Sequence, residues 1–275
     1  MKVQFWGVRG SIAVPGPGTI HYGGNTSCVA VHCGERLIVL DAGSGLRALG
    51  QALKQSSDAV DLDLLLTHCH VDHLIGLPFF APAFSPASAI RIWAGHLSPR
   101  QRLEQVLGQL MIEPLLPITP STFRADLTYR DFLAGDRLDL GGGVEVRTAL
   151  LNHPGGATGY RIDFRGHSVC YLTDYEHPAI EPEPALVDLV RGADLVIYDA
   201  MYTNEEYASR VGWGHSTWEQ GVRLLQAAGA KQLALFHHDP SRDDAAMDAV
   251  VAAAVRVHPG TFGAREAMVV DLGAP

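Results

Sequence analysis

The chain has 275 residues, of which 47% are hydrophobic, so it can bury a sizeable core, and no Pro/Gly/Ser-rich linker divides it. We therefore expect one domain over residues 1–275. The formal net charge is −9 and the Lys and Arg residues are scattered, which argues against a protein that grips long RNA or DNA, because such proteins carry a basic stripe. No segment approaches the roughly 18 consecutive apolar residues of a membrane-spanning helix, so none is expected.

The cysteines point to a reducing compartment. Cys28, Cys33, Cys69 and Cys170 form no CxxC pair. No apolar signal core precedes the strand-like start of the chain. Both observations favour a reduced, cytoplasmic protein.

Predicted strands and helices alternate along the chain after a strand-rich start. Helical periodicity predicts helices over 74–80, 99–111, 216–228 and 241–256. This alternation is typical of a layered α/β protein. Apolar and β-branched runs predict strands over 2–6, 27–33, 36–40, 62–66, 144–151, 168–172, 194–198 and 232–236.

The region of about 96–135 is a candidate insert. Its predicted helix has one apolar face, and an irregular apolar stretch follows at 113–117. Packing of this face into the core is one interpretation, and a lid over the site or a homodimer contact is the other. The face is formed by Leu103, Val106, Leu107 and Leu110.

Four candidate metal ligands follow the strand at 62–66 within six residues, in the pattern H-x-H-x-D-H. They are His68, His70, Asp72 and His73. Such a short segment beyond a strand end cannot spread far, so these side chains must crowd together. Protonated imidazoles would repel one another there, whereas neutral imidazoles can all donate to one cation. The pattern predicts a metal site.

Other His and Asp residues stand at the ends of further predicted strands. Any one of them could be a turn-former or a helix cap. Active sites of layered α/β proteins gather at strand ends, so this repetition predicts a single site. The residues are Asp41, His153, Asp174, Asp199 and His237.

A second motif lies at Gly212–Thr217 and contains His215. Ser216 and Glu219 have the spacing of a capping box, which predicts that a helix begins at Ser216. The N-terminus of a helix attracts anions, so His215 there could contact a phosphate or protonate a leaving oxygen. An ordinary histidine in a glycine-flanked turn is the alternative.

With these motifs in place, the chain resembles the metallo-β-lactamase-fold hydrolase superfamily, from Trp6 to about Asp239. The resemblance implies a four-layer αββα sandwich with two divalent metals at one edge, Zn²⁺ or Mn²⁺ or else Fe. It assigns His68, His70 and His153 to the first metal. Asp72, His73 and His237 would bind the second metal, Asp174 would bridge the two, and Asp41 would orient the His-rich loop.

The segments His215–Thr217, Gly7–Ser11 and Gly24–Ser27 resemble the phosphodiesterase branch of that superfamily, which contains ribonuclease Z and cyclic phosphodiesterases. In that branch an acid at the position of Asp199 partners the His. The resemblance implies hydrolysis of small cyclic or nucleotide phosphodiesters by metal-activated hydroxide. The catalytic residues would be Asp72, Asp199 and His215, the last as general acid or phosphate contact. Substrate contacts would come from Ser216, Thr217 and Asn25.

Three other activities were weighed against this one. A tRNA-processing role is not expected, because the chain shows neither a long Gly/Pro-rich arm nor a basic stripe. A lactonase or thioesterase of the same fold would use the same metals but would need less help for its leaving group. A non-catalytic metal-bound sensor or binding module would not need His215.

Overall fold

The computed structural model describes residues 1–57 and 59–273, and in this part of the chain two seven-stranded sheets lie face to face. The first sheet has the order β14-β1-β2-β3-β4-β5-β6 and the second the order β13-β12-β11-β10-β9-β8-β7. The strands of the first sheet are β1 (Lys2–Gly7), β2 (Cys28–Cys33), β3 (Arg36–Leu40), β4 (Asp61–Leu66), β5 (Ala89–Ala94), β6 (Asp126–Asp131) and β14 (Val269–Asp271). Those of the second are β7 (Arg137–Gly141), β8 (Val144–Leu151), β9 (Ala157–Phe164), β10 (His167–Leu172), β11 (Leu195–Asp199), β12 (Gln232–Phe236) and β13 (Thr261–Gly263).

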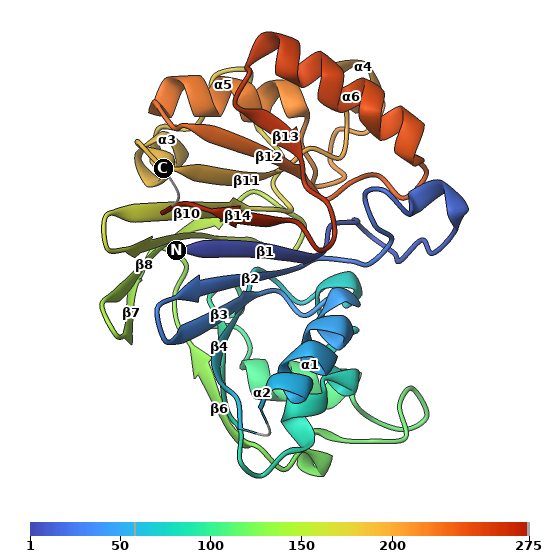
Figure 1. Ribbon diagram of the computed structural model, residues 1–275, viewed down its shortest axis with the longest axis vertical. Coiled ribbons are helices and arrows are strands. Elements are labelled where there is room, and N and C mark those ends of the chain that lie inside the picture. Colours follow the sequence, from blue (N-terminus) through green and yellow to red (C-terminus); the bar gives the residue numbers. More distant parts are fainter. Residues whose placement is uncertain (58, 274–275) are drawn as a thin grey trace.

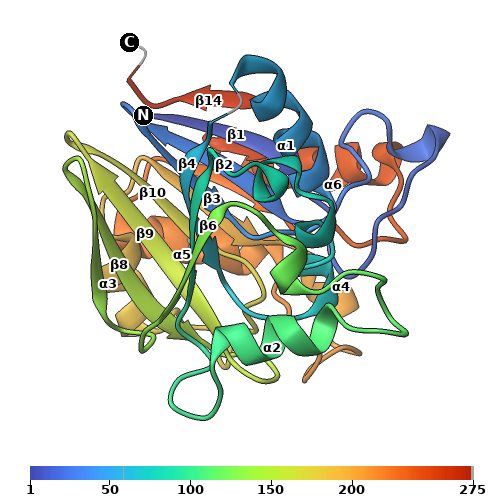
Figure 2. The same cartoon turned by 90° about the horizontal axis from the view of Figure 1, so that it is seen from below.

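Helices cover the outer face of each sheet, with α5 and α6 on one side of Figure 1 and α1 and α2 on the other. The view from below in Figure 2 shows α1 and α2 at different places over the first sheet. The four-layer αββα sandwich predicted from the sequence is confirmed. The helices are α1 (Gly45–Ser56), α2 (Leu103–Leu110), α3 (Pro184–Val190), α4 (Asn204–Tyr207), α5 (Trp218–Ala228) and α6 (Asp244–Val257).

Three apolar cores hold the layers together. The central core lies between the sheets and includes Phe5, Tyr171 and Phe236, all buried. The other two lie between each sheet and its own helices. Strand β4 is buried on both faces over Leu62–Leu66, which explains the apolar run Leu64–Leu66, and its buried Asp63 pairs with Arg36 and Arg91. No helix among the described residues is long and apolar enough to cross a membrane.

The strand directions gather the candidate ligands at one edge of the sandwich. Strands β3 and β4 are parallel, and so are β10, β11 and β12. Strand β8 runs with β10, because both are antiparallel to β9. The carboxyl ends of these strands therefore open onto the edge from which their loops emerge.

All four predicted helices differ from the observed ones. The 3₁₀ turn Leu77–Phe79 stands in place of the helix expected over 74–80, because Pro78 lacks the N–H of a helical ladder. The helix expected from 241 begins at Asp244, after the cap Asp243. The helix expected from Ser216 begins two residues later, as described below.

The segment 96–135 supplies parts of the first sheet and its outer layer. Strand β6 pairs with β5, and Leu103 and Leu107 of α2 are buried in the core beneath. Helix α2 covers only Leu103–Leu110 of the predicted 99–111. Beyond it, Ile112 and Leu115 are 48% and 70% exposed. The apolar face of the helix therefore packs into the core, whereas a lid or dimer role for the exposed loop stays a prediction.

Candidate metal centre

The structure brings all seven predicted ligands together in the loops that follow the strands. The cluster at 68–73 follows β4, whereas the other ligands follow β8, β10 and β12. The ligand atoms form one group from His68, His70, His153 and Asp174, and a second from Asp72, His73 and His237, each within 4.8 Å. Asp174, His215 and His237 form a third such group. The first two groups have the membership expected for two metal positions, and metal binding there stays a prediction.

Asp174 lies between the two groups and presents one carboxylate oxygen to each. Its Oδ1 is 3.7 Å from Nε2 of both His68 and His153. Its Oδ2 is 3.1 Å from Nε2 of His73 and 3.2 Å from Nε2 of His237. This is the geometry required of a bridging ligand.

The buried ring nitrogens of the cluster fit a bound cation. Among the described residues, Nε2 of His68, His73 and His237 have no hydrogen-bond partner. Such atoms are costly unless something satisfies them, and a divalent metal shared with the carboxylates would satisfy all three. Nδ1 of His70 and Nε2 of His153 lie 3.1 Å apart, so both also point to a common position.

The electrostatics of the cluster favour the same ligand. Burial lowers the pKa of His70 and of His153, and burial together with His73 lowers the pKa of His68, so these rings are kept neutral. Burial also disfavours a charged His73, but Asp174 and the other carboxylates outweigh it and raise its pKa well above the usual range. The carboxylates thus attract a cation, and the neutral rings of His68, His70 and His153 keep lone pairs that can bind it.

Asp41 supports the cluster from behind, as predicted for it. Its Oδ1 accepts from the backbone N–H of Thr67 at 2.7 Å, and its Oδ2 lies 2.8 Å from Nδ1 of His73. The hydroxyl of Tyr171 donates to Oδ2 at 2.9 Å. His73 is therefore held with Nε2 toward the ligand group, which is how outer carboxylates orient metal-binding imidazoles.

Three residues of the site have a left-handed backbone. Asp41, Asp174 and His237 have φ values of 63°, 57° and 58°. Non-glycine residues rarely adopt this conformation, and where they do the surrounding structure must enforce it. Asp41 and His237 directly follow a strand and Asp174 follows β10 by two residues, so each turn directs its side chain across the sheet edge.

The N-terminal segment Gly7–Ser11 packs under the His237 loop. The buried Arg9 guanidinium donates to the carbonyls of Gly23, Asp239 and Arg242. The N–H of Gly10 donates to His238 O, and that of Ser11 donates to Asp72 Oδ2 at 2.9 Å. The sequence indicated this motif only through its resemblance to a family. The contacts of Arg9 and Gly10 explain why these residue types occupy the two positions.

His215 lies beside the ligand cluster and is paired with Asp199, as the sequence predicted. Its Nδ1 is 2.9 Å from Asp199 Oδ2, and its ring stacks on His237 with centroids 4.9 Å apart. Burial disfavours the charged ring, but the Asp199 carboxylate outweighs this and raises the pKa of His215 to about 9. Asp199 also accepts from the N–H of Asp174, which ties this pair to the bridging ligand.

The capping box expected at Ser216 is wrong. Thr217 is the N-cap of α5 and accepts from Gln220 N at 3.2 Å. The Ser216 hydroxyl instead lies 2.9 Å from both His177 Nδ1 and the Tyr198 hydroxyl. Because its hydroxyl bonds to these two side chains, Ser216 does not cap the helix.

The three predicted substrate contacts have other partners in the fold. Ser216 and Thr217 are fully buried, and Thr217 also donates to Asn204. Asn25 donates from N and Nδ2 to Glu266, and its Oδ1 accepts from Ser44. We therefore do not retain these residues as substrate ligands.

A cleft of about 630 Å³ opens beside His153. It is also lined by His96, which the sequence did not indicate as a candidate site residue. The His96 ring stands edge-on to His68 with centroids 6.4 Å apart. Its Nδ1 is buried without a partner among the described residues, and burial lowers its pKa to about 4. Like the ligands, His96 follows a strand, but β5 was not among the predicted strands. Arg100, Leu133, Leu150 and Asn152 also line the cleft.

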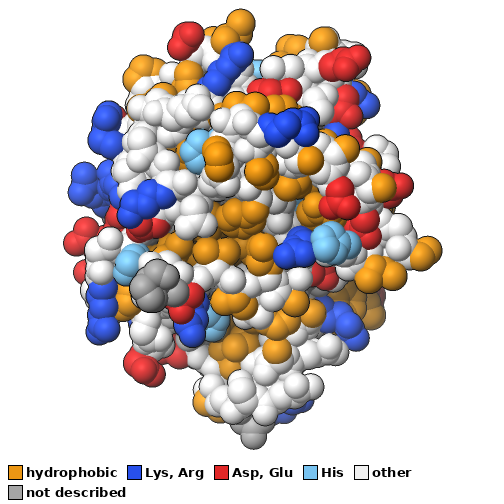
Figure 3. Space-filling model, turned by 45° about the horizontal axis from the view of Figure 1, so that its top comes forward, with side chains coloured by type: hydrophobic (Ala, Val, Ile, Leu, Met, Phe, Trp, Pro, Cys, Tyr) orange, Lys and Arg blue, Asp and Glu red, His pale blue; other side chains and the backbone are white. Residues whose placement is uncertain are grey.

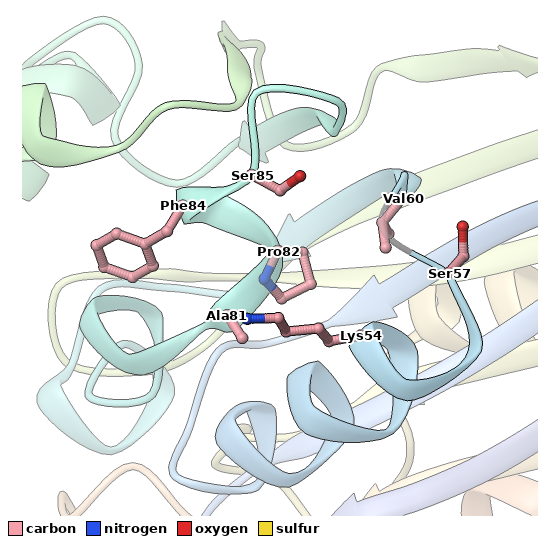
Figure 4. Close-up of a pocket in the computed structure, with 7 residues that line it drawn as sticks. All are labelled: Lys54, Ser57, Val60, Ala81, Pro82, Phe84 and Ser85. Atoms are coloured by element: carbon pink, nitrogen blue, oxygen red, sulfur yellow. The ribbon is translucent and has the colours of Figure 1, made fainter.

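A second pocket of about 230 Å³ lies between the end of α1 and the 3₁₀ turn Ala81–Phe84 (Figure 4). Lys54 extends toward Ala81 along it. None of the candidate ligands lines this pocket, so we assign it no part in the site.

Comparison with known proteins matches the chain to one family. Residues 36–238 match the model described as a beta-lactamase superfamily domain. Ribonuclease Z of Thermoplasma acidophilum is 23% identical over 303 aligned positions, covering 89% of this chain and 88% of that protein. Ribonuclease Z of Brevibacillus brevis is 32% identical over only 85 residues, which are 30% of this chain and 27% of that protein.

Solved structures share the fold over nearly the whole chain. Human tRNase Z, short form, has a TM-score of 0.70 at 20% identity and covers 100% of both chains. A diphosphatase from the PhnP family has a TM-score of 0.71 at 20% identity, covering 98% of this chain and 97% of that one. Zn²⁺-bound PqqB from Methylobacterium extorquens has a TM-score of 0.72 at 15% identity, covering 98% and 100%. At these identities the likeness shows the fold alone.

Proposed function

Because the chain belongs to the beta-lactamase superfamily, we propose that it is a dinuclear metal-dependent phosphodiesterase acting on small cyclic or nucleotide phosphodiesters. The broader class expected from the sequence, a metal-dependent hydrolase of phosphoric esters, is supported by the ribonuclease Z relatives. The more specific proposal, a dinuclear phosphodiesterase, rests on the His215–Asp199 pair, which lies beside two ligand groups joined by Asp174.

The two ligand groups suit Zn²⁺ or Mn²⁺. Imidazole nitrogens and carboxylate oxygens are donors that both ions accept, and a structural neighbour holds Zn²⁺. Bound divalent ions supply positive charge that neutralises phosphoryl oxygens and lowers the pKa of water toward neutrality. Asp174 would contact both positions, and Asp72 only the second.

His215 supplies the acid that a phosphodiester requires. Asp199 occupies its Nδ1, so Nε2 is the ring nitrogen that can meet a substrate. With a raised pKa the ring holds a proton at neutral pH, which it can give to a departing alkoxide or use to bind a phosphoryl oxygen. Lactones and thioesters need this proton less, which is why we favour phosphodiesters over them.

The surface favours a small substrate over a long nucleic acid. The face in Figure 3 shows Lys and Arg interspersed with Asp and Glu rather than gathered in a stripe. The net charge is −9, and the cleft beside His153 has the volume of a small-ligand site. One structural neighbour is a tRNase, so structured tRNA is the substrate against which this proposal must be tested.

The cysteines support a reducing compartment such as the cytoplasm. All four are free thiols, and three of them are buried. A protein that carries four unpaired cysteines suits a compartment in which thiols stay reduced.

One comparison tests the proposed function. Purified protein loaded with Zn²⁺ or Mn²⁺ is assayed against bis-p-nitrophenyl phosphate, a 2′,3′-cyclic nucleotide, a lactone panel and a tRNA precursor. We expect the two small diesters to be hydrolysed fastest. Faster lactone hydrolysis would contradict the phosphodiesterase, and efficient tRNA cleavage with steep salt dependence would contradict the small substrate.

A further inference from the structure

Glu176 is a buried carboxylate that joins three loops of the site. It stands two residues after Asp174 and is 8% exposed. Its Oε1 accepts from Gly212 N at 2.6 Å and its Oε2 from Gly214 N at 2.7 Å. Its backbone N–H and C=O each bond to Asn152 at 2.8 Å, one residue before His153. One residue thus links the loops that carry Asp174, His153 and His215.

Gly214 transmits this link to His153. Its carbonyl oxygen lies 2.7 Å from His153 Nδ1, so its N–H is held by Glu176 and its C=O by the imidazole. Nδ1 must donate in this bond, which leaves Nε2 of His153 unprotonated and turned toward Asp174. A Cβ at Gly214 would lie 2.4 Å from Nδ1, so the loop backbone rests directly against the ring.

The loop at 208–216 depends on side chains for its shape. It runs between α4 and α5 and takes left-handed turns at Gly212 and Gly214, with φ values of 90° and 87°. Tyr207 donates to Glu176 Oε1 at 3.0 Å, so the carboxylate receives three hydrogen bonds in all. An amide at the same place could not accept from both glycines, because one of its ends is a donor.

We propose that Glu176 is a positioning residue for the metal centre. Its carboxylate holds the 212–216 loop so that His153 presents Nε2 to the first ligand group while His215 stays aligned with Asp199. The first part of this inference concerns metal binding alone. The second part, on His215, rests on the proposed phosphodiesterase function.

Glu176→Gln tests both parts while conserving side-chain size. Outer-shell partners of metal-bound imidazoles typically change metal affinity ten- to a hundredfold, so we expect the Zn²⁺ dissociation constant of the first position to rise by about that factor. Competition with a chromophoric chelator measures it without any assay of activity. For hydrolysis, we expect kcat to fall more for a dinucleotide than for bis-p-nitrophenyl phosphate, because p-nitrophenolate leaves without a proton.

Glu206→Gln is the matched control. The Glu206 carboxylate also accepts from a backbone N–H, that of Thr203 at 2.7 Å, and it pairs with Arg242. Among the described residues, no hydrogen bond or ion pair joins its side chain to the 212–216 loop. It should change thermal stability without changing Zn²⁺ affinity or the ratio of the two rates. If Glu176→Gln fails to fold, Glu176→Asp keeps the charge but is too short to reach both glycines, and the same measurements apply.

The outcomes separate the two parts. Unchanged Zn²⁺ affinity in the folded Glu176 variants would overturn the positioning of His153. With Zn²⁺ at a concentration that saturates every variant, equal losses on both substrates, or a further loss when Glu176→Gln is added to His215→Ala, would overturn the positioning of His215. If the wild-type protein hydrolyses neither diester, the proposed function fails, and the Zn²⁺ titration still decides the role of Glu176 at His153.

Discussion

His215 separates a phosphodiesterase from an esterase at the scale of one residue. Its Nδ1 is held by Asp199, and the ring stacks on His237. With Asp174 and His237 it forms the third group of possible ligand atoms, outside the two groups assigned to the metals. We predict that His215→Ala keeps both metals and the fold but slows dinucleotide hydrolysis by about two to four decades. The loss should be smaller for p-nitrophenyl esters, and Asp199→Asn should have a weaker effect of the same kind.

The comparison of leaving groups makes this prediction specific. A histidine with only a structural role would lower thermal stability and slow all substrates alike. Metal analysis and the melting temperature of His215→Ala provide the control for folding. Equal rate losses for good and poor leaving groups would leave His215 with phosphate binding at most.

His96 offers a second test at the residue scale. It lines the cleft beside His153 and is only partly buried, so a substrate group that enters the cleft can hydrogen-bond to the ring. We predict that His96→Ala raises KM by about tenfold for a nucleoside p-nitrophenyl phosphate, the change expected from losing one hydrogen bond of about 1.4 kcal/mol. The KM for methyl p-nitrophenyl phosphate, which lacks the nucleoside group, should not change. An equal rise in KM for both esters would contradict a role of His96 in the cleft.

At the scale of elements, the strand ends were the most predictable part of the site. Strand β11 is buried along its length, and its apolar run stops at the polar partner Asp199. The run Leu64–Leu66 at the end of β4 stops in the same way before the His-rich loop. Such a boundary is visible in one sequence. It placed the His-rich loop and Asp199 correctly before any contact was known.

Predictions from the sequence were wrong or incomplete where tertiary contacts override local sequence signals. Ser216 has the sequence of a helix cap, but its hydroxyl bonds to His177 and Tyr198, which lie far away in the chain. Glu176 was missed because a carboxylate that binds two glycine N–H groups leaves no local pattern. His96 was missed together with β5, whose alternating burial gives a weaker apolar signal than a fully buried strand.

Gly10 tests how closely the N-terminal segment packs on a ligand loop. A Cβ at Gly10 would lie 2.6 Å from the His237 ring and 2.5 Å from Met201 Cε. His237 is buried and cannot move away freely, so we predict that Gly10→Ala costs about 1–3 kcal/mol and weakens the second metal position. Denaturant unfolding and metal analysis measure the two effects.

Gly16→Ala is the control for Gly10 in the same N-terminal segment. No atom outside its chain neighbours lies within 4 Å of a Cβ there. This variant should keep both stability and metal content. A Gly10→Ala protein with wild-type metal content would show that the contact with His237 does not position the ring.

At the scale of the whole molecule, each metal position would join the two sheets. The first group takes His68 and His70 from the loop after β4 and His153 from the loop after β8. The second group takes Asp72 and His73 from the first of these loops and His237 from the loop after β12. Because neither group is complete on one sheet, the centre exists only when the sheets are packed together.

Metal binding should therefore stabilise the folded chain as a whole. A ligand that binds only the native state adds about 2.7 kcal/mol per site at a hundredfold excess over its dissociation constant. We predict that chelation lowers the melting temperature by several degrees and that added Zn²⁺ or Mn²⁺ restores it. The increment should shrink at acidic pH, because protons then compete for the imidazoles. The lowered pKa values of His68, His70 and His153 place this loss below the usual titration range of histidine. In the double variant His68→Ala/His237→Ala, added metal should no longer raise the melting temperature. If neither chelator nor metal changes the melting temperature of the wild-type protein, the dinuclear centre is refuted.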